Sequence, residues 1–73
     1  MSSQSFRDFA HKLVGEEVEV VTNNGTFTGT LEYVGGDSII LRTRIRGRIV
    51  RLAIRIALII ALFSLLTGRR FTF

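Results

Sequence analysis

Alternation of apolar and polar side chains, interrupted by short turns, is the feature that most limits the folds open to this chain. The alternation begins near Glu16 and is typical of half-buried β-strands. It breaks at three turn signals, which are Asn24-Gly25, Gly35 to Ser38 and Arg46 to Arg48. The pattern predicts strands over about 16–22, 26–34, 39–45 and 49–55, and an apolar run predicts a fifth strand over about 57–64.

A short amphipathic helix is expected before the first strand. Apolar side chains recur there at helical intervals, namely Phe6, Phe9, Ala10, Leu13 and Val14. Ser5 and Asp8 have the spacing of a capping box, and Gly15 can end the helix as a C-terminal cap. We therefore expect a mainly β fold, with a helix over about 6–14 followed by a five-stranded, strongly bent antiparallel barrel.

The first predicted hairpin contains the reason for the bend. With Asn24-Gly25 as its two-residue loop, Val18 lies opposite Leu31 and one face is largely apolar. Gly29 stands in the middle of the second strand, where it contributes no packing. A glycine in that place indicates a sharp bend or the close approach of another backbone, and a closing barrel needs such a bend.

The second predicted hairpin separates apolar from basic side chains. With Gly47-Arg48 as its loop, apolar side chains meet on one face and Arg44 lies directly across from Arg51 on the other. The basic face holds Arg42, Arg44, Arg46, Arg51 and Arg55. Like charges placed opposite each other repel, so a retained arginine face indicates an anionic ligand. The alternative is compensation by acids on neighbouring strands, which are Glu17, Glu19 and Glu32.

Charge divides the chain into an acidic and a basic half. Residues 1–37 carry six acids and two bases, whereas residues 38–73 carry eight arginines and no acid, which gives −4 and +8 within a net charge of +4. A half this basic suggests an anionic partner such as nucleic acid or an acidic membrane surface. Pairing between the unlike halves of neighbouring subunits is the alternative.

The residue types give no support for catalysis, metal binding or a cofactor. The chain has no cysteine and one histidine, so it lacks thiolate zinc ligands and a histidine cluster. No nucleophile motif or phosphate loop occurs, and we expect neither an enzyme nor a small-molecule substrate. The first residues lack the apolar segment of a signal peptide, and the uncharged run from Ile56 to Leu66 is shorter than the ~20 residues of a membrane-spanning helix. A cytoplasmic protein is expected.

Two segments together resemble the signature motifs of the Sm and Sm-like (LSm) proteins. The first motif is matched from Leu13 to Leu41, by the residues around Val18, the Asn24-Gly25 turn and Gly29. The second is matched by Ile45 to Arg51, which contains an isoleucine-arginine-glycine turn followed by a β-branched pair. The elements occur in the family's order and spacing, and the resemblance covers roughly residues 6–63.

The resemblance implies a helix that caps a five-stranded barrel, and protomers that join fourth strand to fifth in a hexameric or heptameric ring. It also implies binding of single-stranded RNA near the pore, at the turn after the second strand and at the Arg-Gly turn. Here those turns hold Asp37 and Ser38, and Arg46 and Gly47. The first turn lacks the family's stacking residue, and Ile54 to Ile56 replace the Tyr-Lys-His-like motif of bacterial Hfq, a family member of similar size. Binding with low sequence preference is therefore expected.

The leading hypothesis is a homo-oligomeric ring that binds single-stranded RNA. Its predicted RNA-binding residues are Arg42, Arg44, Arg46, Gly47, Arg48, Arg51, Asp37 and Ser38. The alternative is a structural or membrane-surface oligomer, in which the arginines meet anionic lipid. In that hypothesis Phe63 and the basic-aromatic tail over 69–73 enter the lipid interface.

Overall fold

The computed structural model describes residues 3–73, in which one α-helix precedes six β-strands. The elements are α1 (Ser3–His11), β1 (Glu17–Thr22), β2 (Gly25–Val34), β3 (Ser38–Ile45), β4 (Arg48–Arg55), the 3-10 helix η1 (Ile56–Leu58), β5 (Ile59–Ser64) and β6 (Arg70–Thr72). Neighbouring strands pair antiparallel in one sheet of order β4-β3-β2-β1-β5-β6. The prediction of a mainly β chain with an N-terminal helix is confirmed. No helix within residues 3–73 has the length and apolar character that crossing a bilayer requires.

The sheet is open, so the predicted closed five-stranded barrel is wrong. β4 and β6 are its two edges, and within residues 3–73 no ladder joins β4 to β5. Residues 70–72, expected as part of a tail, form β6 and pair with β5 through Leu62 and Phe71. The predicted strand over 57–64 is shorter because residues 56–58 form η1. The outer hydrogen-bonding edge of β5 is therefore occupied within the chain, which leaves it unavailable for barrel closure onto β4.

The helical segment ends differently from the predicted range over 6–14. α1 stops at His11, and Ser5 lies inside it rather than capping it. The chain then continues in tight turns, where the Leu13 N–H donates to the Ala10 carbonyl at 2.8 Å. Gly15 has a φ of 93° and its N–H donates to the Leu31 carbonyl at 2.7 Å, which turns the chain toward the sheet. This left-handed conformation favours glycine, but the prediction that Gly15 caps the helix is wrong, because α1 has already ended at His11, four residues earlier.

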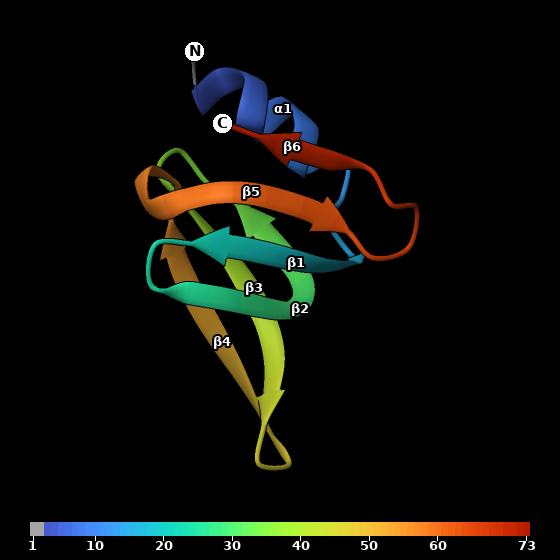
Figure 1. The fold of residues 1–73 in the computed structure, drawn as a ribbon. Helices are drawn as coiled ribbons and strands as arrows, with labels where there is room; N and C mark the ends of the chain where they lie inside the picture. Colours follow the sequence, from blue (N-terminus) through green and yellow to red (C-terminus); the bar gives the residue numbers. More distant parts are fainter. Residues whose placement is uncertain (1–2) are drawn as a thin grey trace.

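The core lies between the curved sheet and the N-terminal segment. Phe6, Ala10 and Leu13 are buried on the side of the helical segment. Their buried partners from the sheet and η1 are Val18, Val20, Leu31, Val34, Ile39, Leu41, Ile54, Ile56, Ile59 and Leu62. β6 and the residue after it pack against the helix. The centroid of the Phe6 ring lies 5.6 Å from that of Phe71 and 5.2 Å from that of Phe73. Figure 1 shows α1 and β6 together at one end of the molecule.

Both hairpins are paired two residues away from the predicted register. Val18 pairs with Gly29 rather than Leu31, because Asn23 and Asn24 form the loop and Gly25 begins β2. In the second hairpin Arg46 and Gly47 form the loop, with φ values of 54° and 81°. Positive φ at both central residues characterises the type I′ turn. A shift of two residues keeps each side chain on its predicted face, because strand side chains alternate with period two.

Gly29 marks a close approach between β2 and β3. A Cβ at this position would lie 2.6 Å from the carbonyl oxygen of Arg42 and 3.2 Å from the Cβ of Thr43. Any side chain would therefore push the two strands apart. The prediction that another backbone comes close to Gly29 is confirmed.

Candidate nucleic-acid interface

The outer part of the β3–β4 hairpin projects from the body of the molecule (Figure 1). β3 pairs with β2 from Ile39 to Arg42 but with β4 along its whole length. Residues 43–50 therefore form a two-stranded projection, which we call the hairpin tip. The main-chain ladder between the two strands and the type I′ turn hold its shape.

Four of the predicted site residues lie on the hairpin tip. Arg46 and Gly47 form the turn, Arg44 pairs across the ladder with Ile49, and Arg48 pairs with Ile45. Within residues 3–73, the guanidinium groups of Arg44, Arg46 and Arg48 take part in no ion pair. The tip thus presents three uncompensated positive charges to solvent, beside the exposed side chains of Ile45 and Ile49.

Arg42 and Arg51 are arranged differently from the prediction, because Arg42 and not Arg44 lies across from Arg51. Glu32 on β2 separates their charges. Its Oε2 lies 3.3 Å from Nη1 of Arg42, and its Oε1 accepts a hydrogen bond of 2.8 Å from Nε of Arg51. Compensation by Glu32 is therefore confirmed for these two arginines, while Glu17 instead accepts a hydrogen bond of 3.3 Å from Thr30. One carboxylate between two guanidinium groups leaves this cluster with a net positive charge.

Asp37 and Ser38 lie at the opposite end of β3 from the Arg46-Gly47 turn. Seven residue steps separate Ser38 from Ile45, which is roughly 23 Å of strand at about 3.3 Å per residue. The main chain of both residues has local partners, because the Ile56 N–H donates to the Asp37 carbonyl and the Gly35 N–H donates to the Ser38 carbonyl, each at 2.8 Å. The chain by itself therefore does not bring the two predicted halves of the site together.

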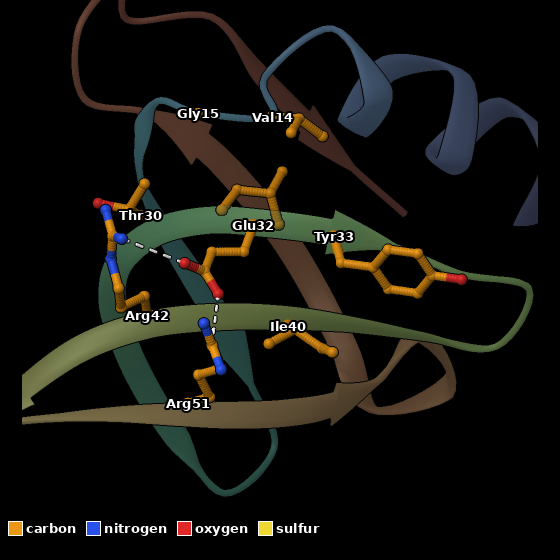
Figure 2. A pocket seen from close by; sticks show the side chains of 9 residues that line it. Val14, Gly15, Thr30, Glu32, Tyr33, Ile40, Arg42 and Arg51 are labelled. Carbon is orange, nitrogen blue, oxygen red and sulfur yellow. Dashed lines mark hydrogen bonds and ion pairs between the residues drawn. The ribbon is translucent and has the colours of Figure 1, made fainter.

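Two grooves run beside the arginines. The first has a volume of about 580 Å³ and is lined by Val14, Gly15, Thr30, Leu31, Glu32, Tyr33, Ile40, Arg42 and Arg51 (Figure 2). The second has a volume of about 600 Å³ and is lined by Glu17, Thr28, Gly29, Thr30, Arg42, Thr43, Arg44 and Ile49. Thr30 and Arg42 line both grooves. The two grooves therefore adjoin each other beside Thr30 and Arg42.

Comparison of the chain with family models, with curated proteins and with solved structures found no match. The arrangement of a small antiparallel sheet behind an N-terminal helix is compatible with an Sm-like fold. Within residues 3–73, no three histidine, cysteine, aspartate or glutamate side chains gather in a way that could hold a metal ion.

Sequence reasoning left two residues out of the site. Glu32 entered only as one of three acids that could compensate arginines, and Tyr33 was not among the predicted site residues. The β2–β3 register shifts between Leu31 and Tyr33, so Tyr33 pairs with Ile40 on the outer face of the sheet. An irregularity of this kind has no reliable sequence signal other than the nearby glycines.

Proposed function

We propose that this protein binds single-stranded RNA with low sequence preference through the β3–β4 hairpin, and that it does so as an Sm-like protein. The observation that carries the proposal is the hairpin tip with Arg44, Arg46 and Arg48, which have no ion-pair partner within residues 3–73. Each phosphate that such a cation neutralises releases counterions and adds affinity that falls with salt. Phosphate contacts of this type carry no sequence information.

Apolar side chains between the arginines favour a single strand over a duplex. Ile45 and Ile49 are exposed on the hairpin tip, each directly across the ladder from an arginine. A duplex stacks its bases inside, whereas a single strand offers unstacked bases that can lie against apolar side chains. The preference for RNA over DNA comes from the resemblance to the Sm-like family.

We further propose that the protein assembles with copies of itself, as a hexamer or heptamer if it follows the family. The unpaired outer edge of β4 supports assembly, because an edge strand offers free main-chain groups to another copy. A joint between β4 of one copy and β5 of the next would require β6 to leave β5. Sedimentation of the full chain, and of a chain lacking residues 69–73, would test this. A monomer in both cases would contradict assembly.

RNA titration at rising salt tests the proposed function. The full chain should bind U-rich, A-rich and mixed oligomers with similar affinity. Replacing Arg44, Arg46 and Arg48 together by glutamine should reduce the slope of log affinity against log salt by roughly 2, since each phosphate that is no longer neutralised accounts for about 0.7. Lys12→Gln is the control, because Lys12 is an exposed cation outside the hairpin. Failure of the unmodified chain to bind any of the three oligomers at low salt would refute the proposal.

The packing of the C-terminal tail against the helix argues against the membrane-surface hypothesis. Phe71, which that hypothesis places in lipid, packs on Phe6 and on Phe9, the latter at 5.7 Å between ring centroids. Inserting it would require those contacts to break. Binding of the full chain to acidic liposomes that disappears when residues 69–73 are removed would favour this alternative over RNA.

A further inference from the structure

The outer face of β2 carries an exposed aromatic ring beside the arginine cluster. Tyr33 is 56% exposed, although it lies within a strand, and it is the sole tyrosine of a chain without tryptophan. Its pairing partner Ile40 shares this face with Arg42, two residues further along β3. The face therefore combines an aromatic, an aliphatic and a basic side chain within one groove.

The groove has one apolar end and one basic end. Figure 2 shows Tyr33 and Ile40 on one side, Arg42 and Arg51 on the other, and Glu32 between them. Its volume is about 580 Å³, and it is open to solvent rather than enclosed.

Gly35 leaves room for the tyrosine ring. Its φ lies outside the left-handed region, so the backbone does not require glycine there. A Cβ at Gly35 would lie 2.9 Å from Cε2 of Tyr33 and 3.3 Å from the carbonyl oxygen of Ser38. The ring thus rests over the start of the β2–β3 turn, which restricts the positions it can take. An ordered ring loses less conformational freedom when a planar ligand stacks on it.

The arginines keep free donors after they pair with Glu32. Each guanidinium group has five N–H donors, and the carboxylate contacts Arg42 through Nη1 and Arg51 through Nε. The remaining donors and the net positive charge of the cluster suit a phosphate. A nucleotide likewise joins a planar, largely apolar base to an anionic phosphate.

We propose that this groove binds one nucleotide of the RNA strand, with its base stacked on Tyr33 and its phosphate held by Arg42 and Arg51. The inference rests on the proposed RNA binding and adds a base-contacting position to it. Thr30 and Arg42 also line the second groove, which reaches Arg44, so one strand can pass from the hairpin tip into this position. Stacking on an aromatic ring tolerates every base, which agrees with low sequence preference.

The fluorescence of the unmodified chain tests the proposal directly, because Tyr33 is its only tyrosine and no tryptophan masks it. Titration with single-stranded oligouridine should quench the tyrosine emission at saturation. Inorganic polyphosphate, which has no bases, should bind without quenching. Free N-acetyltyrosinamide under the same additions corrects for light absorbed by the RNA.

Substitution of Tyr33 supplies a second measurement. Tyr33→Ala should weaken RNA binding about 5- to 150-fold, the equivalent of roughly 1–3 kcal/mol for one base stack. Tyr33→Phe keeps a ring and should bind RNA within about twofold of the unmodified chain. Neither variant should change the affinity for polyphosphate, because phosphate contacts come from the arginines.

The outcomes separate this inference from the proposed function. RNA binding without quenching, together with unchanged affinity of Tyr33→Ala, would leave RNA binding in place and overturn the stacking position. Equal losses of RNA and polyphosphate affinity in Tyr33→Ala would also overturn it, because the ring would then act only on the fold. An unmodified chain that binds polyphosphate but no RNA overturns both.

Discussion

The base and the tip of the β3–β4 hairpin have similar sequences but very different surroundings. At the base, Ile39 and Leu41 are fully buried beneath the helical segment and the rest of the sheet. At the tip, Ile45 is 48% and Ile49 62% exposed. Both parts alternate apolar residues with others, and both are held by the same main-chain ladder. Alternation therefore specifies a strand, whereas a core also requires another layer to cover the strand's apolar face.

This difference would let one hairpin serve both the stability of the fold and the proposed binding. Its base joins the core through β2, and its tip carries arginines and exposed isoleucines beyond the last β2–β3 pair, between Thr30 and Arg42. The boundary between the two parts lies near Gly29, where the main chain of β2 comes close to that of Arg42 on β3. Substitutions on either side of this boundary should therefore affect different properties.

The largest effect is expected from truncating the base. Leu41→Ala should lower the free energy of unfolding by about 2–5 kcal/mol, because it leaves a cavity in the core. Ile45→Ala on the tip should lower it by less than about 1 kcal/mol, because the side chain is half exposed. Urea denaturation of both variants measures the two values. Equal losses would mean that the tip is covered in solution, as assembly through this surface would require.

An intermediate effect is expected at the boundary. Gly29→Ala should lower the free energy of unfolding by about 1–3 kcal/mol, because the new methyl group meets the Arg42 main chain. Gly36→Ala is the matched control, since a Cβ there has no neighbour within 4 Å and no left-handed φ is involved, and it should change stability by less than about 0.5 kcal/mol. Thermal unfolding followed by circular dichroism compares the two. A neutral Gly29→Ala would contradict the close approach of β2 and β3.

The smallest effect is expected in the turn of the tip. Arg46 has a left-handed φ of 54°, which asparagine adopts more readily. Arg46→Asn should raise the free energy of unfolding by roughly 0.5 kcal/mol. It should also reduce the salt slope of RNA binding by about 0.7, because the variant has one cation fewer. A variant that loses stability while keeping the salt slope would contradict both assignments to Arg46.

The sequence predicted which helix and strands form better than it predicted whether the sheet closes into a barrel. Local patterns located the helix, the first five strands and the arginine face, because alternation and turn residues act within a few positions. The two-residue register error at Arg46-Gly47 arose from placing glycine first in the loop, whereas a type I′ turn accepts it second. Whether the sheet closes depends on which segment reaches the edge of β5. That contact is made by residues 70–73, and the 3-residue strand β6 is too short for alternation to reveal it.

The positive charge of the candidate site was predictable from the sequence. Which side chains of β2, β3 and β4 lie together in it was not. The excess of arginine after residue 38 can be read from composition, and so can the short supply of acids to compensate it. Arg42, Arg51 and Glu32 come together only in the observed register of three strands. The outward position of Tyr33 depends on the irregularity of β2 beside Glu32. A shift of one residue in pairing reverses which side chains share a face, so periodicity alone could not identify the groove.

The packing of α1 on β6 has a consequence for the topology of the chain. Because the rings of Phe6 and Phe73 stack, the first and last described segments meet at the end of the molecule opposite the hairpin tip (Figure 1). A short linker could join them, and new termini could be opened between Asn23 and Asn24, whose turn connects β1 to β2. Such a circular permutant would keep every ladder of the sheet, so its circular dichroism should match that of the parent. The order in which the strands are connected is then less decisive for this fold than the neighbours each strand has across the sheet.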